Sequence, residues 1–131
     1  MGFVYDAALS AVIAIASPWL AWRSRAGRPG PWRLWKGPSF PKPSSGKPVV
    51  WFHGVSVGEI HLLGPVVAAF RQRHPELEVV VSSTTPTGLE EARKRFPDTV
   101  VSPFPFDLSW QLRSAFDSLR PAAVVLAESE L

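Results

Sequence analysis

The sequence contains no cysteine, which excludes disulfide bridges and thiolate metal sites. Its three histidines lack a metal-ligand spacing such as H-E-x-x-H, so we expect no metal and no cofactor. Neither G-x-G-x-x-G nor G-x-x-x-x-G-K-[ST] occurs, so no loop has the pattern that cradles nucleotide phosphates. The candidates for chemistry are therefore hydroxyl, carboxylate and imidazole side chains.

Acidic residues are scarce in the first third of the chain. The 131 residues have a net charge of +3 and are 46% apolar, enough for one domain with a packed core. Through Pro48 there are seven basic residues and one acid, Asp6, whereas the remainder has seven basic and ten acidic residues. A basic cluster beside an apolar segment is more typical of a membrane surface than of nucleic-acid binding. We expect a membrane partner and no nucleic acid.

The apolar segment is Ala7–Trp22, which carries no charge. As a helix it would span about 24 Å, and extension to Gly2 brings it closer to the roughly 30 Å of a bilayer core. The positive charge follows the segment, which places the following domain in the cytoplasm by the positive-inside rule. We predict a membrane-anchor helix over residues 1–22, spanning the membrane or lying in its inner leaflet. A signal peptide cleaved near Ala14 and Ala16, or a helix buried on the domain, are the alternatives.

Residues 23–47 are rich in proline, glycine and basic residues and are typical of a linker. Residues 48–131 alternate between apolar runs and helical spacing, which predicts an α/β domain with a Rossmann-like parallel sheet. We expect one helix face to carry Leu63, Val66, Val67 and Phe70, and another helix to be capped by Asp107. The predicted strands are Val49–Phe52, Glu78–Ser83, Thr99–Ser102 and Ala122–Ala127, with a turn over Thr84–Gly88 and a helix over Leu89–Phe96.

The loop His53–Gly58 joins the first strand to the first helix and allows three interpretations. Gly54, Ser56 and Gly58 form G-x-S-x-G, the pattern of a nucleophile elbow. Ser56 and Glu59 also form a capping box, which is a purely structural feature. Glu59 is itself the third candidate, because a carboxylate in the first turn of a helix is favoured in its ionised form and can accept a proton.

A serine hydrolase can be tested within the sequence. The α/β-hydrolase order is serine, then acid, then histidine, and no histidine follows Asp98, the first aspartate after Ser56. The hydrolase interpretation is therefore disfavoured unless a further segment supplies the partners.

Thr87 and Glu90 suggest a second capping box. A four-strand parallel sheet that ends without a covering helix suggests a fragment of a longer protein.

Four motifs give the chain its resemblance to a known family. They are HGVSVGE (53–59), TTPTG (84–88), PFD (105–107) and RPAAVVLAESEL (120–131), and they follow an apolar N-terminus. In this order and spacing, the chain resembles the N-terminal half of a 3-deoxy-D-manno-octulosonic acid (Kdo) transferase. That resemblance implies a membrane-associated glycosyltransferase of the GT-B type, which moves Kdo from CMP-Kdo to a lipid A precursor in lipopolysaccharide biosynthesis at the cytoplasmic face of the bacterial inner membrane.

The resemblance also implies roles for particular residues. Glu59 would be the general base of an inverting reaction that needs no metal. Glu128 and Glu130 match the family's E-x-E-L element beside the cleft, and the loop positions that match are Ser56, Gly58, Thr85 and Gly88. The donor CMP-Kdo would bind mainly to a C-terminal domain absent here, so the acceptor domain over residues 48–131 is expected to be truncated and inactive alone.

One stretch departs from the family pattern. The family's Arg- and Gly-rich element between anchor and domain is replaced at Trp32–Lys42 by a stretch with several prolines. Two alternatives stay open beside the transferase. One is a serine hydrolase that uses Ser56, and the other is a non-catalytic, membrane-tethered α/β binding module.

Overall fold

A computed structural model describes residues 2–23 and 37–128. Most of the predicted linker, and Glu130 of the predicted site, lie outside the described residues. The chain divides into two compact units: Met1–Pro38 with Pro105–Arg113, and Ser39–Phe104 with Ser114–Leu131. The second unit contains the sheet and all the site residues described below.

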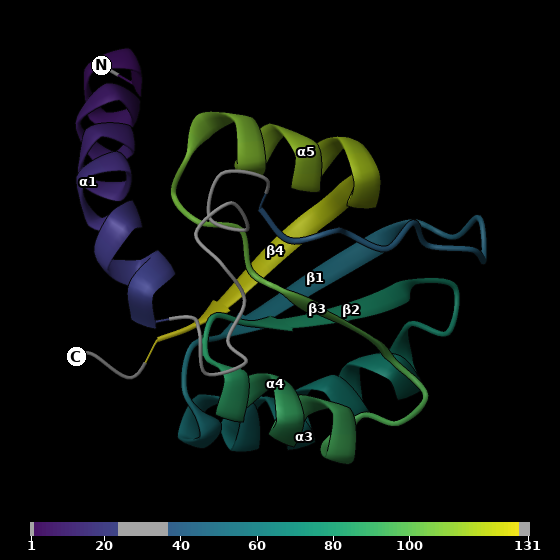
Figure 1. The fold of residues 1–131 in the computed structure, drawn as a ribbon. Coiled ribbons are helices and arrows are strands. Elements are labelled where there is room, and N and C mark those ends of the chain that lie inside the picture. The colour runs from purple at the N-terminus through teal and green to yellow at the C-terminus, as the bar shows by residue number, and fades with distance from the viewer. Residues whose placement is uncertain (1, 24–36, 129–131) are drawn as a thin grey trace. The chain divides into compact units, whose positions relative to one another are not determined.

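The sheet has four parallel strands in the order β3-β2-β1-β4 (Figure 1). The strands are β1 (Val49–Gly54), β2 (Glu78–Ser83), β3 (Val100–Pro103) and β4 (Pro121–Ala127). This confirms the predicted α/β class and parallel sheet. The third strand begins and ends one residue later than predicted, and the fourth begins one residue earlier.

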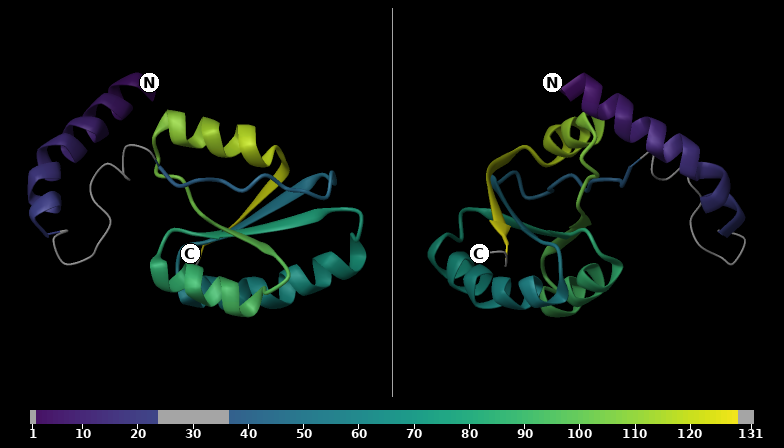
Figure 2. Two further views of the ribbon diagram at one scale, coloured as in Figure 1. Left: turned by 45° about the vertical axis from the view of Figure 1, so that its right-hand side comes forward. Right: turned by 90° about the vertical axis from the view of Figure 1, so that its left-hand side faces the viewer.

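Two helices, α3 (Val57–Arg73) and α4 (Pro86–Arg95), cover one face of the sheet (Figures 1 and 2). Alternate strand residues point to the same face. Val50 and Phe52 therefore meet Val79 and Val81 in one core beneath these helices. Helix α4 begins at Pro86, inside the stretch predicted as a turn, because Thr85 caps it and a proline is well suited to the first helical position.

The predicted buried face of α3 is correct except at one position. Leu63 and Val67 are buried and Phe70 is half-buried, but Val66 is 50% exposed. Ile60 is fully buried and takes the place predicted for Val66. The reason is geometric: a helix turns by about 100° per residue, so Val66 lies on the flank of the face that Ile60, Leu63 and Val67 define.

The other face of the sheet packs on the second half of α5 (Ser109–Leu119). Ala115 and Leu119 of this helix are buried with Val49, Trp51 and Val80 of the strands. Arg120 then adopts a positive φ of 44°, which ends the helix and lets β4 start at the next residue. Since both faces of β1 are covered, this strand is buried along its whole length.

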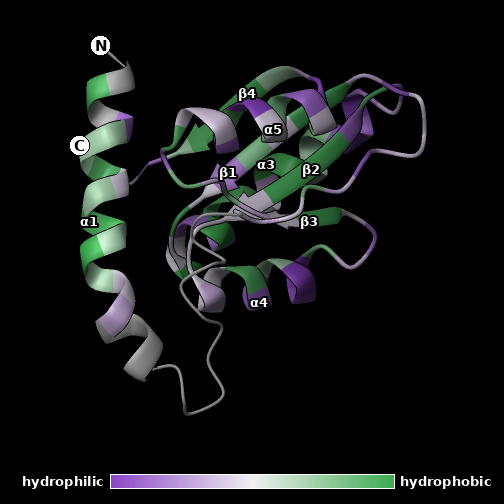
Figure 3. Cartoon of the chain, turned by 45° about the horizontal axis from the view of Figure 1, so that its top comes forward, coloured by the Kyte–Doolittle hydropathy of each residue, from purple (hydrophilic) through white to green (hydrophobic). Residues whose placement is uncertain are grey.

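The first unit contains α1 (Gly2–Arg23), a helix of 22 residues over the stretch predicted to be a membrane-anchor helix. The helix is confirmed, and its role as an anchor stays a prediction. Most of its residues are apolar (Figure 3). Within residues 2–23 and 37–128, no helix combines the length and apolarity that crossing a membrane requires. The prediction that Asp107 caps α5 is wrong. The helix begins at Ser109, whose amide donates to Asp6 Oδ1 at 3.2 Å, so a carboxylate from a distant part of the sequence takes that place.

Candidate active site

The candidate site lies at the carboxyl edge of the sheet, where β1 passes into α3. The connection is short, because β1 ends at Gly54 and Ser56 is already the N-cap of α3. The Glu59 amide donates to Ser56 Oγ at 3.3 Å, which completes the predicted capping box. In parallel α/β sheets this edge is where ligands bind.

The Glu59 carboxylate is held by the backbone of the same loop. Its Oε2 atom accepts hydrogen bonds from the amides of Val55 at 2.5 Å and Ser56 at 3.2 Å. The residue is 8% exposed. Amide donors and the positive end of α3 favour a charged carboxylate in this position. Glu59 is therefore a helix cap, and the same contacts would hold a base in one orientation.

Gly54 allows α3 to approach β1 closely. A Cβ atom at Gly54 would lie 3.2 Å from Glu59 Cβ and 3.3 Å from Ile60 Cδ1. By contrast, a Cβ at Gly58 would meet nothing nearer than Ser56 Oγ at 3.8 Å. Of these two motif glycines, Gly54 is the one at which close packing against α3 leaves little room for a side chain.

The geometry of Ser56 does not match a nucleophile elbow. The elbow is a strained turn, whereas Ser56 has extended backbone angles, φ −104° and ψ 165°. Its hydroxyl oxygen accepts from the Glu59 amide, and the nearest histidine in the sequence, His53, directs Nδ1 to Ser82. The described residues thus give Ser56 the role of a cap, and the hydrolase interpretation gains no support.

His53 is a site residue that the sequence reasoning missed. It is the penultimate residue of the buried strand β1, and its Nδ1 atom lies 3.2 Å from the carbonyl oxygen and 3.0 Å from the hydroxyl of Ser82. The ring stacks on Phe104 with the centroids 3.8 Å apart. The signal in the sequence was a polar residue that directly continues the apolar run VVWF, since a buried polar group needs partners.

The electrostatics of His53 connect the two candidate carboxylates. Burial lowers the pKa of the His53 imidazole, while the Ser82 carbonyl and the charges of Glu59 and Glu128 act in the opposite direction. Because burial is the largest effect, the imidazole is neutral at pH 7. The charges of Glu59 and Glu128 therefore both favour protonation of the His53 ring, against the larger effect of burial.

Glu128 reaches this edge through strand register. Gly54 pairs with Ala127 in the parallel ladder of β1 and β4, so Glu128 directly follows the last paired residue. It is exposed. The structure thus brings Glu59 and Glu128 to one edge of the sheet, as predicted for parallel strands.

Thr85 and Gly88 lie at the same edge, after β2. The Thr85 hydroxyl donates to the Val55 carbonyl at 2.9 Å and accepts from the Gly88 amide at 3.1 Å. Thr85, and not Thr87, is therefore the N-cap of α4, so the predicted Thr87–Glu90 box is wrong. The signal for the correct cap was Pro86, because proline is common directly after an N-cap.

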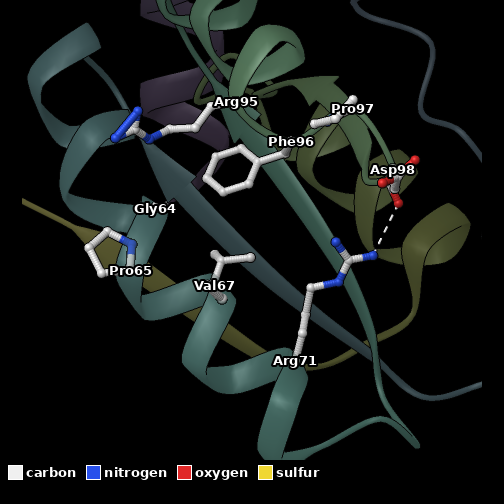
Figure 4. Close-up of a pocket in the computed structure, with 9 residues that line it drawn as sticks. Gly64, Pro65, Val67, Arg71, Arg95, Phe96, Pro97 and Asp98 are labelled. Carbon is white, nitrogen blue, oxygen red and sulfur yellow. Dashed lines mark hydrogen bonds between the residues drawn. The ribbon is translucent and has the colours of Figure 1, made fainter.

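A surface pocket of about 530 Å³ lies elsewhere in the same unit (Figure 4). Arg71 and Arg95 flank it, and Val67 and Phe96 are among its apolar lining residues. Arg71 donates to the Asp98 carbonyl at 3.1 Å, in the loop that leads into β3. That loop is at the amino edge of the sheet, so this pocket is separate from the candidate site. Among the residues that the structure describes, no group of three or more potential ligands could hold a metal ion.

Comparison with known proteins extends this picture. A family model described as 3-deoxy-D-manno-octulosonic-acid transferase (kdotransferase) matches residues 21–131. A protein of Chlamydia muridarum with the name 3-deoxy-D-manno-octulosonic acid transferase is 30% identical over 131 residues, covering 97% of this chain and 30% of that protein. Proteins with the same name from Chlamydophila psittaci and Haemophilus influenzae are 39% and 30% identical, each over 63% of this chain and over 20% and 19% of their own length. No solved structure matches the chain significantly.

The parallel sheet defines the chain as an α/β domain, and it brings Glu59 and Glu128 to the edge where its strands end. More particularly, the chain belongs to the 3-deoxy-D-manno-octulosonic acid transferase family. It spans about a third or less of the length of the curated relatives named above.

Proposed function

We propose that this chain is the acceptor-side part of a glycosyltransferase that moves Kdo from CMP-Kdo to a lipid A precursor in lipopolysaccharide biosynthesis. The observation that carries the proposal is the Glu59 carboxylate, which backbone amides hold at the carboxyl edge of a parallel sheet. The family assignment supplies the substrate class, since the relatives are named as Kdo transferases.

In the proposed reaction, Glu59 is the general base. It takes the proton of an acceptor hydroxyl as that oxygen attacks the anomeric carbon of the donor. The bond between this carbon and the phosphate oxygen breaks, the electron pair leaves with CMP, and the configuration inverts. The step needs no metal and no cofactor. The donor binds mainly to a C-terminal domain, for which the greater length of the relatives leaves room.

The acceptor would lie along the loops that follow β1, β2 and β4. Residues predicted to contact it are Ser56, Gly58, Thr85, Gly88 and Glu128, together with Glu130, which lies outside the described residues. We further propose that the N-terminal helix and the basic residues after it hold the enzyme at the cytoplasmic face of the inner membrane, where a lipid acceptor is available. Basic side chains there would meet the acceptor phosphates as charge-assisted contacts.

Replacement of Glu59 by glutamine distinguishes two roles of this residue, that of a general base and that of a helix cap. Glutamine keeps an oxygen that accepts from the Val55 and Ser56 amides, and it is a natural residue of a capping box, but it cannot take a proton. In a transferase of the relatives' full length that carries this chain, we expect Glu59→Gln to lower kcat by about 10²-fold or more, the scale of general-base catalysis. CMP release from CMP-Kdo in the presence of a lipid A precursor measures it.

The control for this experiment is stability. The variant should unfold within about 1 kcal/mol of the parent in urea, because the cap is kept. Transfer at near the parental rate would show that Glu59 is only a cap. Loss of transfer on Ser56→Ala with Glu59→Gln active would instead favour a serine nucleophile.

A further inference from the structure

Two hydroxyls and one carboxylate meet on a single peptide group, the one that joins Val55 to Ser56. Ser83 Oγ and Thr85 Oγ1 each donate to its carbonyl oxygen at 2.9 Å. Its N–H group, that of Ser56, donates to Glu59 Oε2 at 3.2 Å. The side chains at the end of β2 and the carboxylate on α3 are therefore connected through one planar group.

This arrangement has a physical consequence for the carboxylate. Hydrogen bonds in a chain polarise one another, so a carbonyl that accepts two hydroxyls makes the N–H group of the same peptide a better donor. The peptide plane is also fixed from its carbonyl side, which fixes the direction of the N–H group that faces Glu59. The preceding amide, of Val55, donates to the same Oε2 atom at 2.5 Å, so that oxygen is held at two points.

Gly88 makes room for this arrangement. A Cβ atom at Gly88 would collide with Ser83 Oγ and would lie 2.8 Å from Thr85 Oγ1. Any side chain at this position would therefore displace the two hydroxyls that reach Val55. The TTPTG motif thus has a role inside the protein, in which its second threonine donates and its glycine gives space.

We propose that Ser83 and Thr85 are positioning residues that orient the Glu59 carboxylate through the Val55–Ser56 peptide. The catalytic consequence rests on the proposed function, in which Glu59 is the base. A carboxylate that is less well oriented binds the acceptor as before but takes its proton less efficiently. Loss of either hydroxyl should therefore lower kcat, and loss of the Ser83 hydroxyl should leave KM nearly unchanged.

Three variants isolate the two hydroxyls. Ser83→Ala removes one donor and leaves the cap of α4 intact. Thr85→Asp keeps an oxygen that accepts from the Gly88 amide, as an N-cap requires, but it has no hydroxyl to donate to Val55. Thr85→Ser keeps both interactions and is the matched control.

The first readout does not depend on activity. In the 131-residue chain, amide hydrogen exchange at Val55 and Ser56, followed by NMR, should be up to about tenfold faster in Ser83→Ala and in Thr85→Asp, the scale of one hydrogen bond. Exchange at the α4 amides should stay as in the parent, and Thr85→Ser should match the parent throughout. Unchanged exchange at Val55 and Ser56 in both variants would overturn the proposal.

The second readout is the split between kcat and KM in a full-length transferase that carries this chain. We expect kcat to fall by about three- to tenfold in Ser83→Ala and Thr85→Asp, with rescue by Thr85→Ser. In Ser83→Ala, whose residue is not among the predicted acceptor contacts, KM for the acceptor should stay within about twofold. A rise of KM with an unchanged kcat in Ser83→Ala would overturn the proposal, because it would indicate direct contact of Ser83 with the acceptor. An active Glu59→Gln enzyme would refute the proposed function instead, and the exchange result would still decide whether the hydroxyls orient the carboxylate.

Discussion

Strands β1 and β4 are hydrogen-bonded neighbours with similarly apolar sequences, yet their burial is opposite. Trp51 is 1% exposed and its partner Val124 is 38% exposed, and the next pair, Phe52 and Val125, are 2% and 37% exposed. The difference comes from position: β1 is an inner strand covered by helices on both faces, whereas β4 is at the edge of the sheet. Composition identified both segments as strands, and only the strand order shows which of them forms the core.

The same contrast extends to the ends of the two strands. His53 at the end of β1 is buried and bonded to Ser82, whereas its ladder partner Leu126 is 54% exposed. After β1 the chain enters a loop whose peptide groups are held from two sides, and after β4 it presents Glu128 to solvent. The candidate base, Glu59, therefore lies in the first turn of α3, directly after the most buried strand of the sheet, where its orientation is best determined.

The largest expected effect compares the same substitution in the two strands. Val50→Ala removes two buried methyl groups from the core beneath α3 and α4, and should lower the free energy of unfolding by about 2 kcal/mol. Val125→Ala, on the partly exposed strand, should cost about 0.5 kcal/mol or less. Urea unfolding followed by circular dichroism measures both. Equal losses would mean that β4 is as fully packed as β1.

A second prediction uses the titration of His53. Because burial lowers its pKa in the folded protein, the unfolded chain binds a proton at higher pH than the folded one. Stability should therefore be fully present above the ordinary pKa of about 6.5 and fall as the pH drops through that value towards the lower folded pKa. His53→Gln lacks this titration. The urea midpoint of the parent should fall more steeply between pH 7 and pH 5 than that of the variant, and parallel profiles would contradict the prediction.

Much of the site could be predicted from the sequence because its elements are local. The capping box of Ser56 and Glu59 is encoded within four residues, and the placement of Glu128 follows from parallel strands that end at one edge. Asp6 could not be identified as the partner of the Ser109 amide, since 103 positions separate them and only tertiary structure brings them together. The prediction that Val66 is buried was wrong for a related reason. Helical spacing locates the apolar side of α3, but the direction of the sheet decides which flank is buried.

The hydrogen bonds from Ser83 and Thr85 to the Val55 carbonyl illustrate the same limit of prediction from sequence. Ser83 is the last residue of β2 and Thr85 lies in the turn after it, and small polar residues there give no indication of a bond to a carbonyl 28 or 30 positions away. Thr85 and Gly88 were expected to contact an acceptor, and their observed polar contacts lie within the protein. Whether they also meet the acceptor stays a prediction.

The smallest expected effect concerns the edge of β4. An exposed apolar edge strand is a template for association with another chain, and lysine is a residue that natural edge strands use against this. Val124→Lys places a charge on a side chain that is already 38% exposed, so the free energy of unfolding should change by about 0.5 kcal/mol or less. Association of the 131-residue chain, measured by analytical ultracentrifugation over a range of concentrations, should nevertheless decrease. A stability loss of several kcal/mol would show that this side of β4 is packed like β1, and the contrast between the two strands would disappear.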